Sequence, residues 1–210
     1  MENNGFEGNL TSQSATSDFS ALAFVINSLL GEISTATLVQ VMGVTQAGTL
    51  DPVGFVDILP LVNQWDGNNV SVPHGTIYNC AYFRLQGGTD AIIMDPKIGD
   101  IGIAVFADHD ISTVQITKKQ ANPGSHSRFS MADGLYIGGV LNGVPTQYIQ
   151  YNAAGITLHS PTKVFITAPD VAITGDTVFT GKVTANGKDI SNTHTHTGVQ
   201  TGTDNTGQVT

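Results

Sequence analysis

The sequence has few charged residues, and few of those are basic. Charged residues make up 12% of its 210 residues, about half of the share in an average soluble domain. Eight Lys and Arg stand against seventeen Asp and Glu, which gives a net charge of −9. Proteins that bind nucleic acid gather Lys and Arg on one surface, and the densest basic run here is Lys118-Lys119. We therefore expect no nucleic-acid partner.

Cysteine and long hydrophobic runs are also scarce. Cys80 is the single cysteine of the sequence, so no disulfide can form within one chain. It lies in the apolar run TIYNCAYF, where we expect a buried structural thiol rather than a reactive one. The longest apolar stretch, FSALAFVINSLL, is too short to span a bilayer, and we see no secretory leader. We expect a protein that is made in the cytoplasm and is soluble there.

The first part of the chain, residues 1–30, predicts a polar arm followed by one helix. Residues 1–17 are rich in Gly, Asn, Ser and Thr, which is typical of a disordered or loosely docked arm. Ser17 or Asp18 can cap a helix that runs to about Leu30, with Gly31 as its stop signal. Because apolar side chains occur nearly all round this helix, we expect it to be buried or docked on another subunit.

Residues 31–120 change to short β-type runs that are separated by Gly, Pro and Asn turns. The runs are TATLVQVMGV, GFVDILPLV, TIYNCAYFRL, DAIIMDP, DIGIAVFAD and TVQITKK. Five or six short strands predict a small closed sheet, and we expect an OB-type β-barrel, a name that describes the shape alone. Residues 121–152 are rich in Gly and Pro. They predict a connector with loops around one or two short strands.

Residues 153–190 repeat a short apolar pattern with turn-forming residues in between. Apolar pairs one residue apart recur at Ile156/Leu158, Val164/Ile166, Val171/Ile173 and, more weakly, Val178 with Val183. This alternation predicts a β-helix in which each short strand has one buried face.

A single ribbon of this kind cannot bury its apolar face by itself. Burial requires a cyclic assembly, and three chains intertwined about a threefold axis form a prism with the apolar side chains on that axis. The low charge suits a narrow rod. We therefore predict an all-β protein, in which an N-terminal OB-type β-barrel is followed by an intertwined homotrimeric β-helix that ends in a metal-binding apex.

The predicted apex, residues 191–210, contains His194 and His196 in the segment SNTHTHTGVQTG. Residues two apart on a strand point to the same side. Two imidazoles hold a metal poorly, but three chains supply six, in two layers of three. Six nitrogen ligands suit an octahedral ion such as Fe(II), Ni(II) or Co(II) and leave no open position for catalysis. The alternative is a solvated polar tail, and the end of a trimeric rod at this place favours the metal site.

Other residues that could carry chemistry form weaker patterns. His109 lies between Asp108 and Asp110, which could bind a metal but is more typical of an acidic surface turn. The sequence has no glycine-rich phosphate loop before a helix, no G-x-S-x-G and no C-x-x-C motif, and its acidic residues are scattered. We therefore expect a protein that is not an enzyme.

The barrel, the short β-helix and the terminal H-x-H together resemble the central spike of contractile-tail bacteriophages, the baseplate assembly protein V class. The stretches that carry the resemblance are GFVDILPLVNQWDGNNVSVPHGTIYNCAYFRLQGGTDAIIMDPKIGDIGIAVFADHDIS and ANPGSHSRFSMADGLYIGGVLNGVPTQYIQYNAAGITLHSPTKV. The resemblance implies a virion protein, a homotrimer at the tip of the tail tube. Its barrels join the baseplate hub, and its β-helix meets the host outer membrane first. It also implies one iron ion bound by His194 and His196 of three chains.

Three other interpretations remain open at this point. A trimeric tail fibre that binds a receptor or surface glycan would typically end in a larger domain than the twenty residues after Ile190. A polysaccharide depolymerase or peptidoglycan hydrolase would need a longer solenoid and clustered carboxylates. The same spike could instead serve a tailocin or a related contractile secretion machine.

Overall fold

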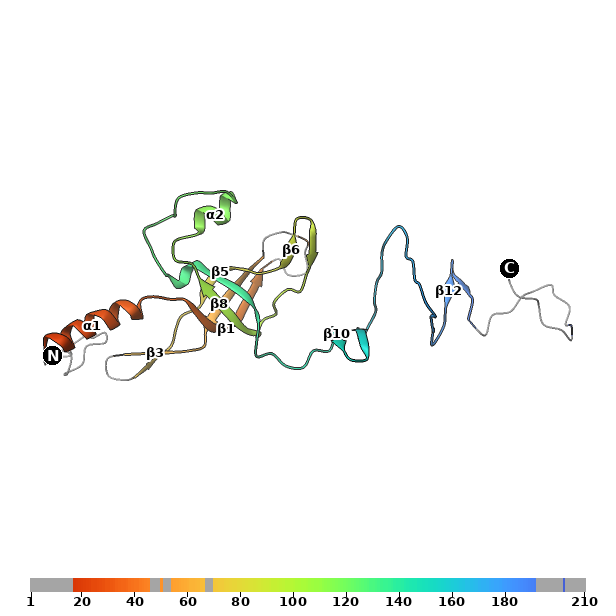
Figure 1. Cartoon of the computed structure of the whole chain (residues 1–210), viewed down its shortest axis with the longest axis horizontal. Helices are drawn as coiled ribbons and strands as arrows, with labels where there is room; N and C mark the ends of the chain where they lie inside the picture. The colour runs from red at the N-terminus through yellow and green to blue at the C-terminus, as the bar shows by residue number, and fades with distance from the viewer. Residues whose placement is uncertain (1–16, 46–49, 51–53, 67–69, 192–201, 203–210) are drawn as a thin grey trace. The chain divides into compact units, whose positions relative to one another are not determined.

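The computed structural model describes residues 17–45, 50, 54–66, 70–191 and 202. The chain divides into two compact units, Met1–Pro145 and Thr146–Thr210 (Figure 1). Among the described residues, no helix is long and apolar enough to cross a bilayer.

The first element is the helix α1, Asp18–Gly31, which begins and ends where the sequence predicts. The Ser17 Oγ caps it by accepting a hydrogen bond from the Ser20 backbone N–H at 3.1 Å. The chain leaves the helix after Gly31, where the Glu32 N–H donates back to the carbonyls of Leu29 and Leu30. No residue of α1 is buried against the described part of its own chain. Of the two expectations for this helix, burial or docking on another subunit, docking is the one that stays a prediction.

A closed barrel of five strands forms the body of the N-terminal unit, which confirms the predicted all-β barrel. The strands are β1 (Ala36–Thr45), β2 (Phe55–Pro60), β5 (Ile77–Tyr82), β8 (Ile101–Phe106) and β9 (Gly134–Gly139). Their order around the barrel is β1-β2-β5-β9-β8. All neighbours pair antiparallel except β5 and β9, which run parallel. Closure leaves none of these strands with an open edge.

The barrel core follows from the alternation of side chains along each strand. In β2, for example, every second residue of FVDILP is buried. The core consists of Val39, Val41, Val56, Ile58, Cys80, Tyr82, Ala104, Phe106 and Tyr136. Glycine makes room for its aromatic members, because a Cβ on Gly54 would collide with the Tyr82 ring and one on Gly102 with the Tyr136 ring. Cys80 is 1% exposed, as expected for a structural thiol.

The fifth barrel strand comes from the segment that the sequence predicts to be a connector. β9 pairs with β5 on one side and with β8 on the other. The barrel therefore extends beyond residue 120, the predicted boundary. The 3₁₀ turn η1, Met131–Asp133, leads directly into β9.

The run TVQITKK is a helix and not the strand that its β-branched residues predict. Helix α2 spans Ser112–Thr117. The Asp110 carboxylate accepts a hydrogen bond from the Ser112 N–H at 2.9 Å and turns the chain into the helix. Lys118 ends it in a left-handed conformation. A strand here would have no partner, since both edges of the preceding β8 are already paired with β1 and β9.

Two small hairpins lie outside the barrel sheet. One joins β3 (Gln64–Trp65) to β4 (Ser71–Val72), and the other joins β6 (Leu85–Gly87) to β7 (Asp90–Ile92). The predicted strand DAIIMDP forms over its first three residues only, and these belong to the β6–β7 hairpin.

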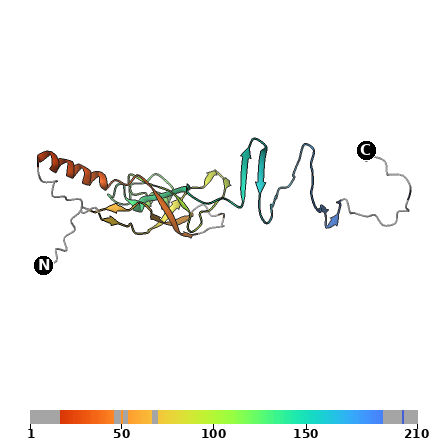
Figure 2. The same cartoon turned by 90° about the horizontal axis from the view of Figure 1, so that it is seen from below.

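The C-terminal unit contains two hairpins and a long segment without strands between them (Figure 2). The hairpins join β10 (Tyr148–Asn152) to β11 (Gly155–His159) and β12 (Thr184–Ala185) to β13 (Lys188–Asp189). Residues 160–183 form no strand in the single chain, although the sequence places apolar pairs there. The trimeric β-helix remains a prediction, because a strand forms only where a neighbour accepts its hydrogen bonds.

Candidate functional site

The two histidines of the predicted apex, His194 and His196, lie outside the described residues. The chain just before them forms the β12–β13 hairpin, whose turn residues Asn186 and Gly187 both have positive φ, 46° and 77°. The Ile190 N–H donates to the Val183 carbonyl at 2.9 Å. The iron site itself stays a prediction.

The second histidine candidate, His109, pairs with a single carboxylate. Its Nδ1 lies 2.9 Å from Oδ2 of Asp108, and both side chains are about half exposed or more. Asp110 is engaged elsewhere: hydrogen bonds from the Ser112 side chain and backbone, and from Ser125, lower the pKa of its carboxyl. In the part of the chain that the structure describes, no three His, Cys, Asp or Glu side chains gather in a metal-binding group.

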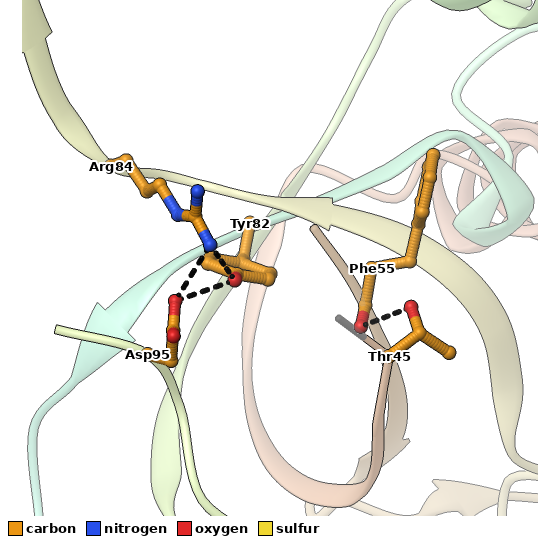
Figure 3. A network of polar contacts seen from close by, with 5 residues as sticks. All are labelled: Thr45, Phe55, Tyr82, Arg84 and Asp95. Atoms are coloured by element: carbon orange, nitrogen blue, oxygen red, sulfur yellow. Dashed lines mark hydrogen bonds and ion pairs between the residues drawn. The ribbon is translucent and has the colours of Figure 1, made fainter. Parts of the chain in front are cut away.

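A buried polar network joins Tyr82, Arg84 and Asp95 (Figure 3). The Tyr82 hydroxyl donates to Oδ1 of Asp95 at 2.7 Å, and Nη2 of Arg84 donates to the same oxygen at 2.9 Å. The Arg84 and Asp95 side chains are 6% and 12% exposed. Desolvation and the hydrogen bond to Asp95 raise the pKa of Tyr82, so its hydroxyl stays protonated and donates. The three side chains form hydrogen bonds with one another, so the network links β5 to the loop after β7.

A hydrogen bond between barrel strands lies in the same view (Figure 3). The Thr45 hydroxyl donates to the Phe55 carbonyl at 3.1 Å, where β1 ends and β2 begins. This contact is exposed and joins the ends of two neighbouring barrel strands.

The candidate interaction surface of the molecule is an apolar face of the β10–β11 hairpin. Ile149 pairs with Leu158 and Tyr151 with Ile156, so all four side chains project from the same side. We call these four residues the C-terminal apolar face. They are 55–75% exposed. In a soluble protein, a hairpin normally packs such an apolar face against another layer of structure.

The opposite side of the same hairpin carries polar and aromatic side chains. The Tyr148 ring stacks on the His159 ring with their centroids 5.1 Å apart, and Gln150 pairs with Thr157. The two sides therefore differ as the two faces of a half-buried strand do. The apolar side, unlike an ordinary buried face, is left exposed in the single chain.

Exposed apolar residues continue through the segment without strands. Five of them lie at the predicted inward positions: Val164, Ile166, Val171, Ile173 and Val178, which are 50–88% exposed. Soluble monomers rarely expose contiguous apolar surface of more than a few hundred Å². Sequence reasoning found this feature from the repeated apolar pairs, but it missed the buried Arg84–Asp95 pair. The signal for that pair was an arginine at the end of an apolar strand run, which requires a carboxylate partner.

Neither the protein-family models nor the curated proteins contain a match to this chain. The function must therefore be argued from its own residues.

Proposed function

We propose that this protein is the central, membrane-piercing spike of a contractile phage tail, a baseplate component that acts as a homotrimer and not as an enzyme. The observation that carries the proposal is the exposure of the C-terminal apolar face and of the apolar positions that follow it. The closed barrel and the resemblance of the sequence to the spike family support it. The barrel, in its OB-type form, would join the baseplate hub, and the C-terminal unit would form the needle.

The physical reason for a trimer is that burying these apolar side chains would lower the free energy relative to leaving them in water. Fully burying a Val or Ile side chain contributes roughly 1.5–3 kcal/mol. In an intertwined β-helix, each chain would supply a neighbour for the strands that residues 160–183 do not form alone. The same contacts would place Ile166 and Ile173 on the threefold axis.

The proposed action is mechanical. When the sheath contracts, the tube drives the trimer through the host outer membrane. This requires a stiff and narrow needle, which interchain β-sheet hydrogen bonds would provide. The apex would be held by one iron ion that His194 and His196 of three chains bind together. Because the ligands must be neutral, the affinity for the metal falls as the pH drops below about 6.5.

The mass and metal content of the purified full chain test this proposal. One chain has a mass of 22.0 kDa, so light scattering should give about 66 kDa for three chains. Elemental analysis should find one iron per three chains. The double variant His194→Ala/His196→Ala should lose the metal and become sensitive to proteases at the C-terminal end, while the barrel keeps its circular dichroism spectrum.

Two outcomes of this experiment would contradict the proposal. A monomeric mass would contradict the proposed trimeric needle. A trimer purified without stoichiometric metal would contradict the proposed histidine site but would remain consistent with the needle. The matched control is His109→Ala, which removes an imidazole that is paired with Asp108 and should change neither the mass nor the metal content.

A further inference from the structure

Helix α1 carries a continuous apolar stripe that its own chain leaves exposed. Phe19, Leu22, Ile26 and Leu29 follow one another at intervals of three, four and three residues, and Ile33 continues the spacing just after the helix. All five are exposed, between 41% for Ile33 and 81% for Phe19. We call these five residues the α1 stripe.

The spacing of the α1 stripe is that of a helix that packs against copies of itself. Alternating steps of three and four residues keep one line of side chains in register with a parallel, identical helix. Val25 and Leu30 flank the stripe and are 50% and 59% exposed. Apolar residues at these flanking positions widen the stripe beyond a two-stranded seam to the face of a helix bundle.

We propose that the α1 helices of three copies of this chain pack on one another through the α1 stripe, as a short parallel three-helix bundle. The inference rests on the proposed trimer and extends it, because it gives the assembly a second contact near the N-terminal end of the sequence. The occupant of the exposed helix face is therefore two further copies of the same helix.

The charge of the helix favours copies of this chain over a lipid surface. Helices that lie on membranes carry Lys and Arg on their polar face, and residues 17–33 contain none. Asp18 is the only charged residue within α1, and Glu32 follows the helix. Both are seven residues from Val25 and so lie on the same edge of the stripe, beside its central line, where charged side chains stay at the rim of a bundle rather than in its core.

The length of the helix explains why the bundle needs the rest of the trimer. α1 has 14 residues, which is two heptads, and helices of this length are marginal by themselves in water. Only four residues separate Gly31 from the start of β1 at Ala36. Chains that already share the C-terminal assembly would hold their helices at a high effective concentration, so a weak contact would form.

Cross-linking of the full chain with a short bifunctional maleimide tests the inference. The variant Ile26→Cys places a thiol on the α1 stripe, and the matched control Asn27→Cys places one on the next residue, also exposed but off the stripe. The native Cys80 is 1% exposed and should not react. In a bundle, Ile26→Cys should give covalent dimers of about 44 kDa, from two chains of 22.0 kDa. Asn27→Cys should give several-fold fewer.

The mass of each variant, measured beside the cross-linking, separates the two proposals. A trimeric mass with equal cross-linking of Ile26→Cys and Asn27→Cys overturns the α1 bundle and leaves the spike proposal intact. The same result is expected if α1 docks on a different protein. A monomeric mass overturns the spike proposal and the bundle with it. A trimer in which only Ile26→Cys cross-links supports both.

Discussion

The barrel and the C-terminal unit use the same kind of residues in the same alternation, with opposite results. Val39, Val41 and Ile58 in the barrel are 0% exposed, whereas Ile156 and Ile173 in the C-terminal unit are 70% and 69% exposed. Both sets are β-branched residues, which favour strands. The type of residue therefore does not explain the difference.

The difference lies in how many neighbours each strand finds within one chain. Every barrel strand pairs on both sides, so the inward side chains of five strands converge on one core. In the C-terminal unit each strand has one partner, and a two-stranded sheet has no second layer to cover its apolar face. Alternation thus predicts which face of a strand is apolar, and pairing decides whether that face is buried.

The largest expected effect comes from placing a charge on the C-terminal apolar face. In the proposed trimer, Ile156→Asp would bring three carboxylates together on the axis, where unpaired charges are strongly unfavourable. We expect the mass to fall threefold, to that of a single chain, while the barrel stays folded. The matched control is Thr157→Asp, on the polar side of the same strand, which should remain a trimer. An Ile156→Asp variant that stays trimeric would contradict the assignment of this face to the interface.

A smaller effect is expected when the barrel core is trimmed. Ile58→Ala removes a side chain that is fully buried, so it should lower the free energy of unfolding of the barrel by roughly 2–5 kcal/mol. Ile103→Ala is the control, because this side chain is 37% exposed on another barrel strand. It should change the stability by less than about 1 kcal/mol. Denaturant unfolding followed by circular dichroism measures both, and equal losses would contradict the packing described for the core.

The smallest effect is a loss of barrel stability in alkali. Burial, helped by the nearby Asp57 carboxylate, raises the pKa of Cys80 from 9.0 to about 11. Below pH 9 the thiol is protonated in both states; between about pH 9 and 11 it ionises first in the unfolded chain, so stability falls as the pH rises. We expect this thiol to account for a loss of roughly 1–3 kcal/mol over that range.

The control for this effect is Cys80→Ala, whose stability should fall less steeply over the same pH range. Some slope should remain above pH 10, because desolvation also raises the pKa of Tyr82 and Tyr136. Unfolding midpoints measured at several pH values give both slopes. Identical slopes for the two proteins would show that the thiol is not the titrating group.

Much of the N-terminal unit could be predicted from local sequence. The Ser17 cap and Gly31 delimit α1, and alternating residues reveal the four barrel strands β1, β2, β5 and β8. These features depend on neighbours a few residues away, which a sequence displays directly. Sequence alone left open whether α1 is buried or docked on another subunit, because an apolar helix does not say what covers it.

The missed features all depend on contacts between distant residues. β9 has the sequence GLYIGG, which resembles a loop, and its place in the sheet depends on β8, its neighbour, where a Cβ on Gly102 would collide with the Gly138 carbonyl. The run TVQITKK has strand-forming residues but no free strand edge beside it. Arg84 needs Asp95, which lies eleven residues further along. The predicted apex at His194 and His196 depends on three chains, and no local pattern can establish that.

The completeness of the barrel core within one chain has a consequence for the order of events during synthesis. The barrel is made before the C-terminal unit and can fold while the ribosome is still at work, at a rate that does not depend on how many copies are present. The proposed needle would have to wait for encounters between chains, which are slower when the protein is dilute. A newly made chain would therefore spend an interval with a folded barrel and an unassembled C-terminal unit. The length of that interval would depend on the expression level.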